Sequence, residues 1–238
     1  MPAAELDVQN LSAGYGQTHV LENVSFSVPA GGRLSILGRN GMGKTTLMAT
    51  LMGLTRRYAG SISVGGQDVT ALRTTGRAQG GIGLVPQTRE IFKSLTVEEN
   101  LFVGLKGRPR SAIEEAYALF PRLQERRRNL GSQLSGGEQQ MLATARTILG
   151  QPAILLLDEP LEGLAPVICD MLMEAFTQLA SSGAMTILFV EQRLESALDF
   201  AEDVIILERG RIVWSGSSAG LRVDGEVLER YVGVGGLH

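Results

Sequence analysis

One segment of the sequence limits the possible folds more than any other. Residues 38–45 read Gly-Arg-Asn-Gly-Met-Gly-Lys-Thr, which fits the pattern G-x-x-x-x-G-K-[ST] of a phosphate-binding loop. Such a loop joins a buried strand to a helix. The sequence provides both, an apolar run at residues 33–37 and a helical pattern at residues 45–52 that ends at Gly53. Backbone N–H groups of the turn and the positive end of the helix dipole bind phosphate oxygens. The chain is therefore predicted to bind a nucleotide.

The residues of this loop have distinct expected roles. Lys44 is expected to reach the β- and γ-phosphates, and the Thr45 hydroxyl is expected to bind Mg²⁺. The residues expected to contact the nucleotide are Gly38, Arg39, Asn40, Gly41, Met42, Gly43, Lys44, Thr45 and Thr46.

A pair of acids follows a second apolar run. Residues 153–160 read Ala-Ile-Leu-Leu-Leu-Asp-Glu-Pro, which predicts a strand that is buried on both faces and ends in two carboxylates. Ligands of parallel α/β sheets bind at the carboxyl ends of the strands. Asp158 is therefore expected to hold Mg²⁺ and Glu159 to act as the general base that polarises an attacking water.

Patterns elsewhere predict an α/β fold with two additions to a mostly parallel, helix-covered sheet. Alternating strands at residues 6–11 and 24–28, with a turn at residues 12–16, predict an antiparallel β subdomain beside the nucleotide site, and residues 60–66 predict a further strand and hairpin turn. Residues 88–150 are helical in character and predict a helical subdomain within a single domain of residues 1–238. Residues 203–215 predict a closing hairpin, and the glycine-rich tail 233–238 is expected to fray.

Composition bounds the class of protein. The chain has 238 residues, 44% of them hydrophobic and 20% charged, which is ordinary for a globular protein with a sizeable core. No apolar run approaches the roughly 20 residues that a membrane span needs, and the N-terminal residues do not have the pattern of a signal peptide. A net charge of -3 argues against general nucleic-acid binding, and a single cysteine fits a reducing cytosol. We expect a cytoplasmic protein whose membrane role requires partners.

A third motif lies at residues 134–140, Leu-Ser-Gly-Gly-Glu-Gln-Gln. Ser135 and Glu138 have the spacing of a capping box at a helix start. Gly136 and Gly137 would then fall in the first helical turn, where each costs up to about 1 kcal/mol relative to alanine. Positions without side chains at a helix N-terminus allow an anion to approach the backbone. The motif therefore indicates a second phosphate-binding helix end and a composite site.

Together these motifs resemble the ATP-binding cassette ATPases over nearly the whole chain, from residue 6 to 231. The resemblance implies that Tyr15 stacks on the adenine of ATP and that Gln87 senses Mg²⁺ and the γ-phosphate and faces the transport partner. It also implies that Ser135, Gly136 and Gly137 contact ATP held by a second ATPase subunit, identical or different, in a head-to-tail dimer. The expected machine includes two integral membrane permeases, with the ATPase at the cytoplasmic face of the inner membrane.

Three segments are most similar to the LivF-type ATPases of branched-chain amino-acid uptake systems. They are residues 85–92 (Val-Pro-Gln-Thr-Arg-Glu-Ile-Phe), 95–101 (Leu-Thr-Val-Glu-Glu-Asn-Leu) and 159–166 (Glu-Pro-Leu-Glu-Gly-Leu-Ala-Pro). The similarity implies ATP-driven import with an external, periplasmic substrate-binding protein. A sister group that energises uptake of urea and short amides shares much of this wording, and export of a lipid-linked solute also stays open.

Two positions depart from the general cassette pattern. Gln192 stands where a switch histidine is usual, and Ala165 stands where an aspartate usually ends the D-loop. Glutamine donates a hydrogen bond to a γ-phosphate but carries no positive charge. Gln192 is still expected to act in catalysis. The alternative function of the chain is that of a regulatory ATP-binding module with slow turnover. A DNA-repair cassette would contain long coiled coils and a ribosome-acting one two cassettes, and neither pattern is present here.

Overall fold

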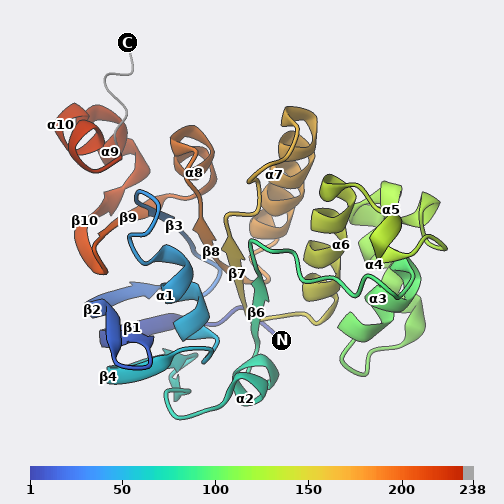
Figure 1. Cartoon of the computed structure of the whole chain (residues 1–238), viewed down its shortest axis with the longest axis horizontal. Coiled ribbons are helices and arrows are strands. Elements are labelled where there is room, and N and C mark those ends of the chain that lie inside the picture. The colour runs from blue at the N-terminus through green and yellow to red at the C-terminus, as the bar shows by residue number, and fades with distance from the viewer. Residues whose placement is uncertain (233–238) are drawn as a thin grey trace.

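The computed structural model describes residues 1–232 (Figure 1). Its frame consists of two β-sheets and the helix at residues 44–51, which packs against both sheets. The expected fraying of the tail 233–238 lies outside these residues. The strands are β1 (Leu6–Tyr15), β2 (Thr18–Val28), β3 (Arg33–Leu37), β4 (Arg56–Val64), β5 (Gln67–Asp68), β6 (Ile82–Val85), β7 (Ile154–Asp158), β8 (Thr186–Val190), β9 (Asp203–Glu208) and β10 (Arg211–Ser217). The helices are α1 (Lys44–Leu51), α2 (Thr74–Gln79), α3 (Val97–Gly104), α4 (Ile113–Leu119), α5 (Pro121–Glu125), α6 (Gly136–Leu149), α7 (Pro166–Ser181), α8 (Leu194–Phe200), α9 (Ser218–Val223) and α10 (Gly225–Val227), with short turns η1 (Arg110–Ala112), η2 (Gly131–Gln133) and η3 (Leu228–Val232).

The larger sheet has the strand order β10-β9-β3-β8-β7-β6 and is parallel except for β10. Strand β7 is buried along its whole length. Its side chains alternate between two cores, with Ile154 and Leu156 facing α1 and the smaller sheet and Leu155 and Leu157 facing α6 and α7. This burial on both faces explains why the strand reads as a continuous apolar run. The predicted mostly parallel α/β sheet is confirmed.

The smaller sheet is antiparallel, with the order β2-β1-β4-β5. The predicted antiparallel sheet is therefore present, but the predicted turn at residues 12–16 is wrong, because β1 continues to Tyr15 and the chain reverses only at Gly16 and Gln17. Gly14 lies within the strand, and a Cβ at this position would lie only 2.0 Å from the Thr18 carbonyl oxygen, so the pairing leaves no room for a side chain. Gly14, which the sequence pattern assigned to a turn, therefore permits close pairing of two strands.

Residues 88–150 contain α3, α4, α5 and α6, as the helical pattern predicted (Figure 1). Four apolar side chains of this segment, Ile113, Ala116, Tyr117 and Phe120, are buried. These side chains share one apolar cluster with Leu155 of the larger sheet. The helical segment thus packs against the α/β core through a continuous apolar layer, and its description as a subdomain stays a prediction.

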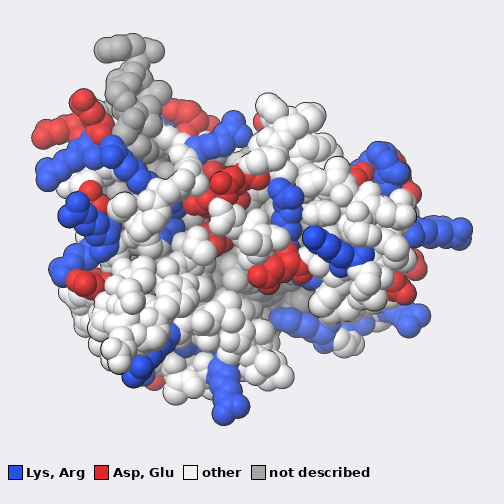
Figure 2. All heavy atoms as spheres, viewed as in Figure 1, with Lys and Arg blue, Asp and Glu red and all other residues white. Residues whose placement is uncertain are grey.

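Figure 2 shows basic and acidic side chains in separate groups on one face, both at its edge and near its middle. None of the helices within residues 1–232 combines the length and the apolar character that crossing a membrane requires.

Candidate functional site

The phosphate-binding loop lies between the end of β3 and the start of α1, as predicted. Gly38 adopts a φ of 149° and a Cβ there would lie 2.4 Å from the Leu207 carbonyl oxygen, so only glycine allows the loop to approach β9. Gly41 has the opposite surroundings, because a Cβ on it would meet no atom within 4 Å. A cleft of about 300 Å³ opens in front of the loop. The residues that line it are Val20, Asn40, Gly41, Gly43, Lys44, Thr45, Thr46, Gln87, Glu159, Glu162 and Gln192.

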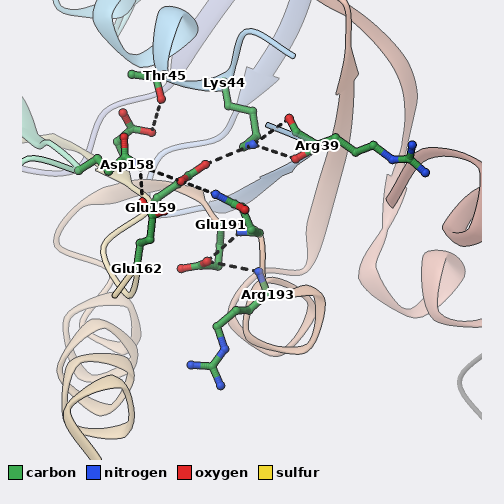
Figure 3. A network of polar contacts seen from close by, with 11 residues as sticks. Arg39, Lys44, Thr45, Asp158, Glu159, Glu162, Glu191 and Arg193 are labelled. Carbon is green, nitrogen blue, oxygen red and sulfur yellow. Dashed lines mark hydrogen bonds and ion pairs between the residues drawn. The ribbon is translucent and has the colours of Figure 1, made fainter. Parts of the chain in front are cut away.

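Lys44 lies at the base of this cleft and is almost fully buried. Its ammonium group donates to the carbonyl oxygens of Gly38, at 2.8 Å, and Arg39, at 3.2 Å. It also pairs with Glu159, with 3.2 Å between Nζ and Oε1 (Figure 3). Because every contact of this ammonium group is to oxygen, it is positioned to exchange a carboxylate oxygen for a phosphate oxygen.

Asp158 ends β7 and faces the start of α1, where the Thr45 hydroxyl donates to its Oδ1 over 3.3 Å (Figure 3). Burial raises the pKa of Asp158 to about 6; the Thr45 hydrogen bond opposes this shift and the Glu159 carboxylate adds to it. An adjoining acid, Glu191, is also buried, and burial raises its pKa as well. The ends of β7 and β8 thus carry carboxylates that have little access to water.

Glu159 connects the separate parts of the site. Its backbone has a φ of 47°, which is uncommon for a residue other than glycine. Its carboxylate binds Lys44 through Oε1, and Oε2 accepts hydrogen bonds from Gln87 Nε2 at 3.1 Å and from Gln192 Nε2 at 2.6 Å. The structure therefore brings together three predicted catalytic residues that lie far apart in the sequence.

Gln87 follows β6 and has a second acceptor, the carboxylate of Glu162. Sequence analysis did not select Glu162 as a site residue. The same argument that identified Asp158 applies to it, because it lies just beyond the carboxyl end of a parallel strand. Val20 was missed for a different reason, since it enters the cleft only through the packing of β2 against the loop.

The groups in the cleft match the chemistry of a nucleoside triphosphate with Mg²⁺. Lys44 and the open glycine loop provide donors and space for phosphate oxygens. Thr45, Asp158 and Gln87 carry hydroxyl, carboxylate and amide oxygens, which are the ligands that Mg²⁺ prefers. Thr45 and Asp158 are already in contact. These residues would hold the ion.

The predicted Ser135–Gly137 motif does not line this cleft. Ser135 caps α6, and its hydroxyl accepts from the Glu138 N–H at 3.3 Å while Glu138 Oε2 accepts from the Ser135 N–H at 2.9 Å, so the predicted capping box is confirmed. Arg122 and Arg126 pair with Glu138 at 3.1 and 3.3 Å. The helix end is therefore held firmly, at a place apart from the loop of its own chain.

Tyr15 is also absent from the cleft lining and is 52% exposed. It is the last residue of β1, just before the hairpin turn, while Val20 of the adjoining strand reaches the cleft. Gly38, Arg39 and Met42, predicted as contacts, belong to the loop but do not line the cleft. Their roles stay predictions.

Residues 21–162 match the family described as ABC transporter. The high-affinity branched-chain amino acid transport ATP-binding protein BraG of Pseudomonas aeruginosa is 38% identical over 96% of this chain and 99% of its own length. The probable branched-chain amino acid transport ATP-binding protein LivF of Archaeoglobus fulgidus is 33% identical over 87% of this chain and 90% of its own length.

A relative of a different named role is also similar. The lipopolysaccharide export system ATP-binding protein LptB of Haemophilus influenzae is 34% identical over 96% of this chain and 97% of its own length. Among solved structures, one titled as an ATP binding subunit of an ABC transporter superposes with a TM-score of 0.80 and 29% identity, covering 91% of both chains.

Proposed function

The chain belongs to the ABC transporter family of ATP-binding cassettes and is an ATPase by that membership, and we propose that it drives a membrane importer for branched-chain amino acids. The observation that carries the proposal is the convergence on Glu159 of the loop lysine, Gln87 and Gln192 in one cleft. The two relatives named for branched-chain amino acid transport support the choice of solute.

In the proposed reaction, Asn40–Thr46 side chains and backbone bind the phosphates of ATP, with Lys44 moving from Glu159 to a phosphate oxygen. Bound Mg²⁺ would neutralise charge on the phosphates. Glu159 then accepts a proton from the attacking water. Gln192 and Gln87 orient that carboxylate through their amide N–H groups.

The proposed assembly contains a second ATPase subunit. A helix end capped by Ser135, with two glycines in its first turn, is suited to bind phosphate but does not line the cleft of its own chain. This arrangement supports a head-to-tail dimer in which Ser135, Gly136 and Gly137 complete the site of the other subunit, identical or different.

A groove supports the proposed contact with the permeases. It lies between the end of α1, β6 and α3, and exposed apolar side chains line it, with Leu54 57%, Phe92 46% and Val103 53% exposed. Pro86 lies in this groove and Gln87 in the ATP cleft, so a partner bound in the groove would contact the segment that carries a cleft residue. We place the ATPase at the cytoplasmic face of the inner membrane, with a periplasmic binding protein reached only through the permeases.

The proposal is tested by uptake of labelled leucine, with urea measured in parallel, in cells that carry wild-type or Lys44→Ala protein. Loss of leucine uptake alone supports the proposed solute, and loss of urea uptake alone replaces it with the alternative importer. Arg73→Ala serves as the control, because Arg73 is an exposed cation that does not line the cleft.

A second candidate is lipopolysaccharide export, which the 34% identity to LptB favours. If neither solute is affected by Lys44→Ala, measurement of lipopolysaccharide at the cell surface distinguishes this candidate. A fall in surface lipopolysaccharide would then support export, and unchanged leucine uptake would count against import.

A further inference from the structure

The hairpin turn that carries Tyr15 is tied to β4 by two side chains that the proposed function does not use. The Tyr58 hydroxyl shares its single proton between the carbonyl oxygens of Gly16, at 3.1 Å, and Thr18, at 3.2 Å. Arg56 donates from Nη1 to the same Gly16 oxygen at 3.2 Å. Both carbonyl groups that flank Gln17 are thus held from one neighbouring strand.

The ring of Tyr58 is itself fixed by its neighbours. His19 stacks on it with 3.9 Å between ring centroids and an angle of 13° between the planes. The Arg56 guanidinium lies 5.5 Å from the centre of the Tyr58 ring. Stacked rings and a cation near a ring face each add stabilisation and restrict side-chain rotation. Tyr58 is therefore a rigid support for the turn, although it lies on the surface of the sheet.

The turn needs such support because its backbone is short and partly glycine. Gly16 has a φ of 60°, the conformation that two-residue hairpin turns favour. Tyr15 pairs with Thr18 across the turn, and Gly14 pairs with His19. A hydrogen bond that fixes the Thr18 carbonyl consequently also limits the motion of the strand position opposite Tyr15.

We propose that Tyr58, supported by Arg56, is a positioning residue that orients Tyr15 for stacking on the base of the bound nucleotide. The inference rests on the proposed role of Tyr15 and adds what fixes the direction of its exposed ring. Stacking strength depends on the orientation of the two rings. A turn that is held from β4 lowers the entropy lost when the base binds. Tyr58 thus affects affinity for the base and leaves phosphate binding to the loop.

A double-mutant cycle on the full chain tests this role. The affinities of ATP and of inorganic triphosphate, each with Mg²⁺, are measured for wild-type, Tyr15→Ala, Tyr58→Phe and the double variant. Phenylalanine keeps the ring that stacks on His19 and removes only the hydroxyl. The melting temperature of each variant is measured as well, to check that the fold is intact. Tyr58→Phe should weaken ATP binding about 3- to 10-fold, the effect of losing one hydrogen bond. Triphosphate affinity should not change.

The cycle separates a positioning role from a merely structural one. If Tyr58 acts through Tyr15, the Tyr58→Phe change has no effect on ATP affinity in the Tyr15→Ala background. An equal loss in both backgrounds, or an equal loss of triphosphate affinity, would overturn the inference. Arg56→Gln is the second variant and should show the same dependence on Tyr15.

The outcome also remains distinct from failure of the proposed function. Lys44→Ala should weaken binding of both ATP and triphosphate, because it acts on the phosphates. If Lys44→Ala has this effect but Tyr15→Ala leaves ATP affinity unchanged, the base-stacking role and this inference are both wrong while the ATPase proposal stands.

Discussion

The ammonium group of Lys44 lies 3.2 Å from a carboxylate oxygen of Glu159, and both side chains are almost fully buried. The residue proposed to bind phosphate is therefore paired with the residue proposed as base. Phosphate has to compete with this carboxylate for the lysine, and Asp158 and Glu162 add negative charge near the same cleft. Nucleotide binding and release of the base from Lys44 are thus coupled events.

This pairing predicts an unequal effect of Glu159→Gln on the two steps. ATP hydrolysis should fall by about 10²- to 10⁴-fold, because the general base is lost. ATP affinity should rise, because Lys44 no longer leaves an ionic partner when phosphate binds. Single-turnover hydrolysis and equilibrium ATP binding measure the two effects. Weaker ATP binding would contradict the competition, and unchanged hydrolysis would show that Glu159 is not the base.

Most of the loop and strand geometry was predictable because it is encoded locally. The spacing from Gly38 to Thr45 sets a turn whose shape depends on its own residues, and the apolar run before Asp158 sets a strand buried on both faces. The position of Glu162 beyond β7 was predictable in the same way as that of Asp158, but its contact with Gln87 was not, because it joins segments far apart in the sequence. The end of β1 was mispredicted because the fit of Gly14 against Thr18 depends on strand pairing, which the local sequence does not specify.

Gln192 allows a prediction about the pH dependence of turnover. Its Nε2 donates to Glu159 over 2.6 Å, so Gln192→Ala should lower turnover about 10- to 100-fold by leaving the base less well oriented. Glutamine does not titrate, whereas imidazole has an ordinary pKa of about 6.5. Gln192→His should therefore retain turnover and acquire a new pH dependence near that value. Steady-state ATPase rates from pH 5.5 to 8.5 provide the measurement. Identical pH profiles for wild type and Gln192→His would show that residue 192 takes no direct part in ATP hydrolysis.

Asp158 gives a prediction for stability without nucleotide. Its pKa is raised from 3.8 to about 6 in the folded chain, so the folded state binds the proton more tightly than the unfolded state. Stability from this group is present below about pH 4 and is lost as pH rises to about 6. The advantage of Asp158→Asn over wild type should grow across this range by on the order of 3 kcal/mol and then stay level.

Denaturant unfolding at several pH values measures this difference. Asp170→Asn is the matched control, because Asp170 is an exposed acid on α7, and its difference from wild type should not follow the same curve. A constant difference in the free energy of unfolding between Asp158→Asn and wild type from pH 4 to 8 would show that burial does not raise the pKa of Asp158.

The glycines at the start of α6 provide a test of the composite site. Gly136 packs beside the Arg89 guanidinium, and a Cβ there would lie 2.9 Å from its Nη1. Gly136→Asp would place a carboxylate at this helix end, pair it with Arg89 and repel a phosphate from another subunit. ATP affinity of the isolated chain should not change, because Gly136 does not line its own cleft. ATPase turnover should fall about 10²-fold or more in a complex whose two ATPase subunits are both copies of this variant.

Mixing variants then determines which chain supplies each half of the site. Gly136→Asp protein has an intact loop but a blocked α6 end, and Lys44→Ala protein has an intact α6 end but a defective loop. Because a composite site needs both parts, neither protein should hydrolyse ATP alone. If the two subunits of the dimer are copies of this chain, a mixture forms one complete site and regains measurable turnover. If the second subunit is a different chain, the mixture stays inactive, and adding that subunit with its own intact helix end restores turnover to the Gly136→Asp protein. Weakened ATP binding by the isolated Gly136→Asp chain would place Gly136 in the site of its own chain and refute the head-to-tail arrangement.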